Sequence, residues 1–131
     1  MKNTLSIAMI VKNEAHNLAR ALMHAHLFAD EIIIVDTGST DNTKEVAKKF
    51  TNNIYDFEWC DDFAKARNCS LSKCTQDFIM WLDADDIITK ENALRLQKLM
   101  KSDIDWDVIY LKYNCDFDAH WNPTFIMKKE R

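Results

Sequence analysis

Glycine and proline are almost absent from this sequence of 131 residues, which holds one of each, Gly38 and Pro123. Average usage would give about nine glycines and about six prolines in a chain of this length. Collagen-like, linker-like and low-complexity architectures are therefore excluded. The glycine-rich phosphate loops G-x-G-x-x-G and G-x-x-x-x-G-K-[ST] are excluded as well, because each needs more than one glycine.

The sequence also lacks long apolar runs and an excess of basic residues. A membrane-spanning helix needs about 20 consecutive apolar residues, and the first residues begin no apolar segment typical of a secretion signal. With 17 basic and 21 acidic residues the net charge is −4, so the chain lacks the positive field that attracts nucleic acid. We expect a cytoplasmic protein with no transmembrane segment and no nucleic-acid partner.

What is present favours a single folded domain over residues 1–131. Hydrophobic residues make up 47% of the chain and charged residues 29%, a balance that supports a core and argues against disorder. The four cysteines, Cys60, Cys69, Cys74 and Cys115, match no C-x-x-C spacing. We expect them to pack as reduced thiols.

Short apolar runs alternate with helical patterns along the chain. Runs of strand length occur at 5–11, 31–35, 53–55, 77–82, 108–113 and 125–127. Helical patterns occur at 14–25, from the turn 36–41 to about residue 50, at 61–72, and after Thr89. This order predicts an α/β fold, with a mostly parallel sheet and helices on both faces.

We expect one of residues 39–41 to cap the second of these helices, Asp61 and Asp62 to cap the third, and Thr89 to cap the fourth. On the third helix, Phe63, Ala66, Ser70 and Cys74 share one side.

Polar clusters follow three of these strands, at 12–14, 36–41 and 83–86. In open α/β sheets, ligands bind at the carboxyl ends of the strands. We therefore expect three loops, distant in sequence, to meet at one edge of the sheet and form a binding site.

The acidic cluster of Asp83, Asp85 and Asp86 follows an apolar strand directly. Carboxylates this close repel one another, so their charge needs a neutralising partner. Mn²⁺ or Mg²⁺ is one candidate, because such an ion binds through one or two carboxylates together with phosphate oxygens and water. The alternative is a solvated turn that caps the following helix.

Asp36 and Glu14 are candidates for holding a nucleoside, since each lies at the end of an expected strand. Asp36 can equally form an Asx turn with its own backbone. Glu14 can accept from a ribose or base, or merely favour a helix N-terminus. Among the tryptophans, Trp81 lies inside a strand pattern and is expected in the core, whereas Trp59 borders a loop near the expected site.

Four segments in order resemble family 2 glycosyltransferases and carry the resemblance over residues 5 to about 90. They are Ser-Ile-Ala-Met-Ile-Val-Lys-Asn-Glu at 6–14, Ile-Ile-Val-Asp-Thr-Gly-Ser-Thr-Asp at 33–41, Ala-Lys-Ala-Arg-Asn at 64–68 and Trp-Leu-Asp-Ala-Asp-Asp at 81–86. The resemblance implies a GT-A fold, a nucleotide-diphosphate sugar donor (often a UDP-sugar), and inverting transfer to a glycan, lipid or protein acceptor that it does not identify.

Roles for five residues follow from the same resemblance. Glu14 and Asp36 would hold the nucleoside, and Arg67 would approach the base or the diphosphate. Asp83 would lie near the ribose or the metal, and Asp85 would bind the divalent cation. Arg67 can also be an ordinary charge on the surface of a helix, although its planar donor fork suits phosphate.

Two departures from the family pattern bear on function. Many members carry Asp-Asp-Gly-Ser where this sequence has Asp36-Thr37-Gly38-Ser39, which leaves the nucleotide open. The family's catalytic base normally lies well beyond the D-x-D motif, and the late acids Asp116, Asp118 and Glu130 sit in no recognisable base motif.

We therefore expect residues 91–131 to begin the acceptor half of a truncated transferase. The alternatives are a non-catalytic domain that binds a nucleotide sugar or a partner, or a nucleotidyl-handling enzyme of the same architecture. The lack of a glycine-rich loop counts against the last of these. A truncated sheet would also expose apolar edges, so homo-oligomers are expected as an option.

Overall fold

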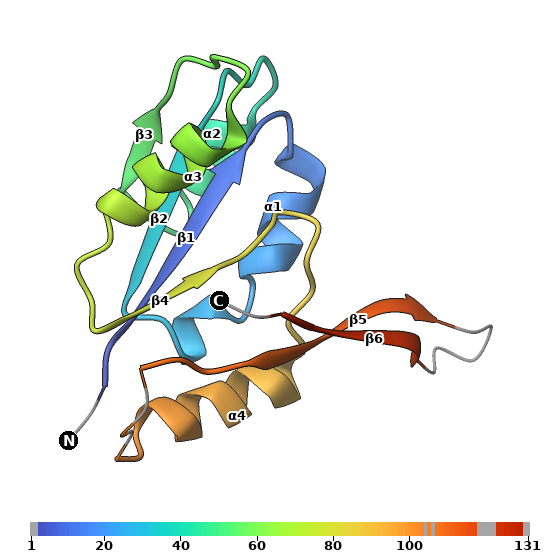
Figure 1. The fold of residues 1–131 in the computed structure, drawn as a ribbon. Helices are drawn as coiled ribbons and strands as arrows, with labels where there is room; N and C mark the ends of the chain where they lie inside the picture. The colour runs from blue at the N-terminus through green and yellow to red at the C-terminus, as the bar shows by residue number, and fades with distance from the viewer. Residues whose placement is uncertain (1–2, 104, 106, 118–122, 130–131) are drawn as a thin grey trace.

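Four parallel strands form the central sheet of the computed structural model, which describes residues 3–103, 105, 107–117 and 123–129. The strands are β1 (Leu5–Val11), β2 (Glu31–Asp36), β3 (Ile54–Asp56) and β4 (Phe78–Trp81), in the order β3-β2-β1-β4 (Figure 1). Each neighbouring pair runs parallel. The α/β fold and the parallel sheet expected from the sequence are confirmed.

The two central strands are apolar on both faces because both faces are covered. Ile7, Ala8 and Met9 of β1 and Ile34 and Val35 of β2 are fully buried. Continuous apolar runs of this kind are typical of parallel strands between two helical layers. The run at 5–11 therefore specifies both the strand and its central place in the sheet.

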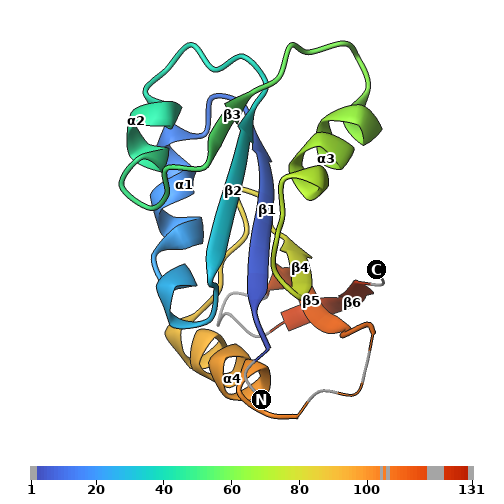
Figure 2. The same cartoon turned by 90° about the vertical axis from the view of Figure 1, so that its left-hand side faces the viewer.

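Helices lie on both faces of the sheet. Figure 2 shows α1 (Ala15–Leu22) and α2 (Thr43–Ala47) on one face and α3 (Phe63–Ser72) on the other. The short 3₁₀ helix η1 (Ala25–Leu27) follows α1, and α4 (Lys90–Met100) packs beside it near the N-terminal ends of the strands. The core lies mainly between β1, β2, α1 and η1, where Leu18 and Leu22 are buried.

Local hydrogen bonds fix where the helices begin. The side chain of Asp62 accepts from the backbone N–H of Lys65 at 3.1 Å, and the side chain of Thr89 accepts from Asn92 N–H at 3.3 Å. Both are N-caps of the type expected. Gly38 has φ 107°, a left-handed conformation that favours glycine in the turn after β2.

Two helical expectations are wrong in detail. The helix expected up to about residue 50 spans only Thr43–Ala47, and its N-cap is Asn42 rather than one of residues 39–41. Phe63, expected on the same side of α3 as Ala66 and Ser70, is 71% exposed, whereas Ala66 and Ser70 are buried. Phe63 is the first residue of the helix, and its ring packs against Trp59 in the preceding loop.

The C-terminal part forms a separate antiparallel ribbon of β5 (Leu111–Phe117) and β6 (Pro123–Lys129) (Figure 1). The strand expected at 108–113 therefore begins later and lies outside the central sheet. Antiparallel pairing suits two strands joined by a short local connection, whereas parallel pairing needs a long crossover.

No helix among the described residues is long and apolar enough to cross a membrane. Cys60, Cys69 and Cys74 are free thiols, but Cys60 is exposed rather than packed as expected. The side chains of the late acids Asp116, Asp118 and Glu130, and that of Cys115, lie outside the described residues.

Candidate functional site

The loops after β1, β2 and β4 all leave the sheet at the C-terminal ends of the strands, here called the carboxyl edge (Figure 1). Val11 and Asp36 are register partners at the ends of β1 and β2. Leu82 N–H donates to Ala8 C=O at 3.1 Å, which extends the β1–β4 pairing one residue beyond β4. Because β1 lies between β2 and β4, the ends of these two strands lie about 10 Å apart across the sheet. In addition, β4 ends opposite Ala8, three residues before the end of β1.

Asn13 joins the first two loops. Its Oδ1 accepts from the backbone N–H groups of Thr40 at 2.7 Å and Asp41 at 3.3 Å, and its own N–H donates to Ser39 Oγ at 2.9 Å. Asn13 has φ 53°, which asparagine tolerates better than most residues. The sequence analysis did not single out Asn13, although an asparagine directly after a strand is a signal for such a turn.

Thr43 makes a second link between these loops from a fully buried position. Its Oγ1 accepts from Glu14 N–H at 2.9 Å and donates to the Asp41 carboxylate, which lowers the pKa of Asp41. Ala15 N–H donates to Asp41 Oδ2 at 3.3 Å. A carboxylate from the β2 loop thus supports the start of α1.

Glu14 lies at the start of α1 without capping it. Its side chain makes no capping hydrogen bond, and its Oε2 accepts from the Asn17 side chain at 3.0 Å. The half-buried Glu14 carboxylate therefore stands at the carboxyl edge, beside the loop that follows Asp36.

Asp36 is the most deeply buried acid of the site, with 1% of the residue exposed. Its Oδ1 accepts from Gly38 N–H at 2.9 Å and Ser39 N–H at 2.7 Å, so the Asx turn considered above is present. Its Oδ2 is buried and has no hydrogen-bond partner among the described residues. Burying a polar atom without a partner is costly, which indicates a place for a ligand donor.

The structure gives the three acids after β4 three different environments. Asp83 Oδ1 is 3.1 Å from Arg67 Nη2. Asp86 is 7% exposed and forms a turn, because its Oδ2 accepts from Asp83 N–H at 2.9 Å and its own N–H donates to Asp83 C=O at 3.0 Å. Asp85 is exposed and has no partner within the described part of the chain.

The charge of this cluster is therefore balanced in part by the protein itself. Sequence reasoning considered a metal ion as the simplest neutralising partner, but Arg67 from α3 already pairs with Asp83. Asp86 forms a turn, but it is buried rather than solvated, and the N-cap of the following helix is Thr89. Of the three acids, only Asp85 has no described partner. The pairing of Arg67 with Asp83 joins residues 16 apart, so it had no local signal in the sequence.

Arg67 is not a solvated charge on a helix surface. Its side chain is 27% exposed, its Cζ lies 5.6 Å from the centroid of the Trp81 ring, and its Nη1 is buried with no partner among the described residues. Trp81 is half-buried rather than fully in the core. Arg67 Nη1 is thus a second buried polar atom without a described partner, a donor where Asp36 Oδ2 is an acceptor.

The described residues form no complete metal cage. No three His, Cys, Asp or Glu side chains gather among them in a way that could hold an ion. An ion that enters with phosphate oxygens and water needs only one or two carboxylates from the protein. The exposed Asp85 fits such an ion, so the residues present are compatible with one that arrives with its ligand.

An aromatic pair joins the loop between β3 and α3 to the first residue of α3. The rings of Trp59 and Phe63 meet edge to face with centroids 4.7 Å apart, and Trp59 Nε1 donates to Asp61 Oδ1 at 3.0 Å. Asp61 has φ 55°, a left-handed conformation. The loop is thus held in a defined shape, but no described contact connects this pair with Asp36 or Arg67.

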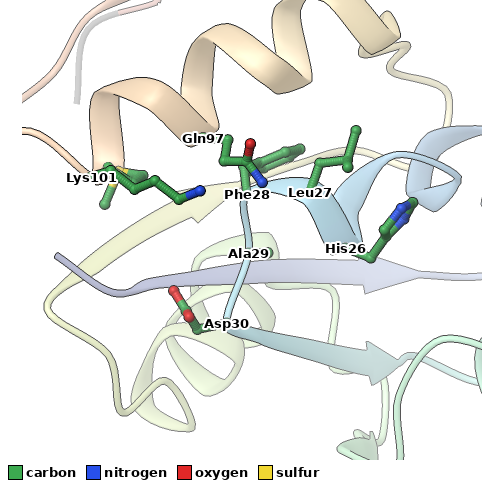
Figure 3. Close-up of a pocket in the computed structure, with 8 residues that line it drawn as sticks. His26, Leu27, Phe28, Ala29, Asp30, Gln97 and Lys101 are labelled. Carbon is green, nitrogen blue, oxygen red and sulfur yellow. The ribbon is translucent and has the colours of Figure 1, made fainter. Parts of the chain in front are cut away.

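Two hollows described on the surface lie away from these residues. One, of about 220 Å³, lies between η1 and the end of α4 and is lined by residues that include His26, Asp30, Gln97 and Lys101 (Figure 3). The other, of about 380 Å³, lies beside β3 and contains the ion pair of Lys44 with Asp56. The hydrogen bond to Asp56 raises the pKa of Lys44. Neither hollow includes a predicted site residue.

The sequence and the fold of this domain match a known protein family. The family model described as "Glycosyl transferase family 2" matches residues 6–131, and the chain belongs to this family. Glycosyltransferase SunS of Bacillus subtilis (strain 168) is 32% identical over 100 residues, covering 75% of this chain and 24% of SunS. A TPR repeat-containing protein of Synechococcus elongatus is 39% identical over 87 residues, covering 66% and 22%. The chain thus spans about a quarter of the length of these relatives.

Solved structures show the same fold. S. aureus TarS 1–349 in complex with UDP superimposes with a TM-score of 0.58 at 24% identity, over 66% of this chain and 29% of that one. Glucosyl-3-phosphoglycerate synthase of Mycobacterium tuberculosis, in complex with Mn²⁺ and UDP-Glc, gives a TM-score of 0.56 at 23% identity, over 65% and 34%. The GT-A fold expected from the resemblance is confirmed.

Proposed function

We propose that this chain is the donor-binding part of a metal-dependent, inverting glycosyltransferase that uses a nucleotide-diphosphate sugar, with a UDP-sugar as the first candidate. The observation that carries the proposal is a pair of buried, unsatisfied polar atoms at one sheet edge, Asp36 Oδ2 and Arg67 Nη1. One is an acceptor and the other a donor. A nucleoside diphosphate offers the complementary groups, N–H and O–H donors at one end and phosphate oxygens at the other.

Asp36 and Glu14 would hold the nucleoside. Asp36 is fixed by its turn to Gly38 and Ser39, so its free oxygen is already oriented before a ligand binds. It would accept from a base N–H or a ribose hydroxyl, and Glu14 would accept from a second group nearby. Thr37 stands where many family members have a second aspartate, so the identity of the nucleobase stays open.

Arg67 and the acids after β4 would hold the diphosphate end. Arg67 Nη1 would donate to a phosphate oxygen, and hydrogen bonds between arginine and phosphate are among the strong ones in proteins. Asp83, kept in place by Arg67, would face the ribose or the ion, and Asp85 would bind Mn²⁺ or Mg²⁺. When bound, the ion supplies charge stabilisation for the departing diphosphate.

The reaction would be a single displacement at the anomeric carbon. The acceptor oxygen forms a bond to that carbon while the bond to the diphosphate oxygen breaks and the nucleoside diphosphate leaves. A carboxylate base takes the proton of the acceptor hydroxyl. The described residues supply the donor half of this scheme, and the base is not identified among them.

A donor-binding module without transfer is the second candidate. It fits the same donor-side contacts and needs no catalytic base, and none is assigned among the described residues. Such a module would bind a nucleotide sugar with the same residues, but it would release no nucleoside diphosphate. The acceptor, the oligomeric state and the cytoplasmic location remain predictions.

Calorimetric titration of the chain with UDP, first with Mn²⁺ and then with a chelator, tests the shared core of both candidates. We expect saturable binding that weakens when the ion is removed. Absence of binding to UDP and to other nucleoside diphosphates would contradict the proposal. Release of UDP from UDP-Glc or UDP-GlcNAc then separates a transferase, which turns over slowly to water or acceptor, from a binding module.

A further inference from the structure

Trp81 and Asp83 lie two residues apart at the end of β4, on the side of the sheet that α3 covers. Alternate residues of an extended strand share a face, and the hydrogen bond from Leu82 N–H to Ala8 C=O keeps the chain extended here. Both side chains contact the same partner, Arg67, in the second turn of α3. The guanidinium is therefore held by two residues of one strand end.

The two contacts restrain different degrees of freedom. Arg67 Cζ lies over the Trp81 ring, 5.6 Å from its centroid, so a cation–π attraction holds the guanidinium above the indole. Asp83 Oδ1 accepts from Nη2 at 3.1 Å, which fixes the rotation of the group within its plane. With both in place, Nη1 is left buried and unpartnered within the described residues.

We infer that Trp81 is a positioning residue, whose ring holds the guanidinium of Arg67 so that Nη1 is directed at an oxyanion bound at the carboxyl edge. This inference rests on the proposed function, which supplies the diphosphate as that oxyanion. Sequence reasoning placed Trp81 in the core, where it would serve only to fill space. Its half-exposed position and its contact with a charged group indicate the second role.

The effect of removing the Trp81 ring on ligand affinity depends on Arg67 if Trp81 is a positioning residue, and does not depend on Arg67 if the ring is purely structural. If the ring acts through Arg67, removing it should weaken ligand binding only while Arg67 is present. If the ring only fills space, its removal should have the same effect with or without Arg67. A double-mutant cycle separates the two cases.

Calorimetry with UDP and Mn²⁺ on Trp81→Leu, Arg67→Ala and the double variant measures this cycle. We expect Arg67→Ala to weaken binding about 20-fold through loss of a charge-assisted hydrogen bond. Trp81→Leu should weaken it about fivefold, and Trp81→Phe, which keeps an aromatic face, less than about twofold. The double variant should bind as Arg67→Ala does. Equal losses from Trp81→Leu in both backgrounds, or none in either, would overturn the inference.

A second readout needs no ligand. The NMR order parameter of the Arg67 Nε–H bond should fall in Trp81→Leu and stay near the wild-type value in Trp81→Phe. Trp59→Leu is the matched control, because Trp59 packs on Phe63 rather than on an arginine. Trp81→Met replaces the leucine variant if that variant does not fold. An unchanged Arg67 signal would refute the positioning role.

The two readouts keep this inference apart from the proposed function. If the wild-type chain binds no nucleoside diphosphate, the proposed function fails, and with it the assignment of the oxyanion. The order parameter then still decides whether Trp81 immobilises Arg67. If the chain binds UDP but Trp81→Leu changes neither the affinity nor the Arg67 order parameter, only the positioning role is refuted.

Discussion

Both ends of the central sheet carry acidic side chains, but these are hydrogen-bonded at one end and partly unsatisfied at the other. At the N-terminal ends of the strands, here called the amino edge, the Asp77 carboxylate accepts from Thr4 N–H at 2.9 Å and from Thr4 Oγ1 at 2.7 Å. Glu31 accepts from Ser6, and from the N–H and hydroxyl of Thr75, both at 2.9 Å. At the carboxyl edge, Asp36 Oδ2 and Arg67 Nη1 have no described partner.

The contrast separates a structural polar cluster from a binding site. Hydrogen bonds lower the pKa of Asp77, and although burial would raise the pKa of Glu31, its hydrogen bonds outweigh burial and lower it. These acids are stabilised as anions by the fold itself. At the carboxyl edge, burial removes two polar atoms from water, and no described residue replaces the lost hydrogen bonds. We therefore expect a ligand that supplies these hydrogen bonds to bind there.

The largest expected effect comes from Asp36→Asn. This change keeps an oxygen for the turn to Gly38 and Ser39 but turns the free acceptor into a donor. We expect UDP affinity to fall about 100-fold, because a matched hydrogen bond becomes a mismatched one. Calorimetry measures it.

Asp77→Asn is the matched control for Asp36→Asn at the amino edge. It should lower the free energy of unfolding, measured by urea denaturation, and leave UDP affinity unchanged. An Asp36→Asn chain that binds UDP as well as the wild type would remove Asp36 from the site.

Asp85→Asn is expected to have the next largest effect. It should weaken UDP binding about tenfold in Mn²⁺ and little in chelator, because one carboxylate contact to the ion is lost. Glu91→Gln is the control, since Glu91 is equally acidic but pairs with Arg95 on the surface of α4. Wild-type binding that does not depend on the ion would contradict the role given to Asp85.

Glu31→Gln addresses the amino edge and should change stability rather than binding. The folded pKa of Glu31 lies below its ordinary value of 4.5, so its contribution is present above pH 4.5 and is lost as the pH falls through the folded pKa. We expect the variant to lose about 1 kcal/mol of its free energy of unfolding at pH 7. Its free energy of unfolding should also fall less steeply on the acid limb, as the pH is lowered. Urea denaturation between pH 3 and pH 7 checks both, and a limb as steep as in the wild type would exclude Glu31 as its source.

The smallest effect is expected from Thr89→Ala, which removes the N-cap of α4. Loss of such a cap costs about 1 kcal/mol or less, so thermal melting should shift by a few degrees. UDP affinity should not change, because Thr89 only orders the helix that follows the acidic turn. A larger loss of affinity than of stability would place this helix start within the binding site.

Much of the fold was predictable because its signals are local. The buried run at 5–11 and the three isoleucines at 32–34 specify central strands, and Asp62 and Thr89 cap helices as expected. The ends of α2 and the exposure of Phe63 were not predictable. They depend on which part of a helix the sheet covers, and that is a tertiary property.

The places of the candidate residues in the fold were predictable, but their contacts were not. Motif order and strand ends pointed to Glu14, Asp36, Arg67, Asp83 and Asp85, and the structure places these residues at or beside one edge. It brings Arg67 together with Asp83, whereas Asp85 has no partner among the described residues. It also adds Asn13 and Thr43 as the links between two loops. These contacts join residues 16 or more apart in sequence, so no local pattern encodes them.

The sequence by itself determined the α/β class, the family and the acids that follow the strands, because periodicity and motif order are properties of neighbouring residues. Tertiary structure alone decided which polar atoms are satisfied. The folded chain gives Asp86 to a turn and Asp83 to an arginine from another helix, and it leaves one oxygen of Asp36 and one nitrogen of Arg67 buried without a described partner. Hydrogen-bond satisfaction depends on distances between distant segments, and those distances exist only once the chain has folded.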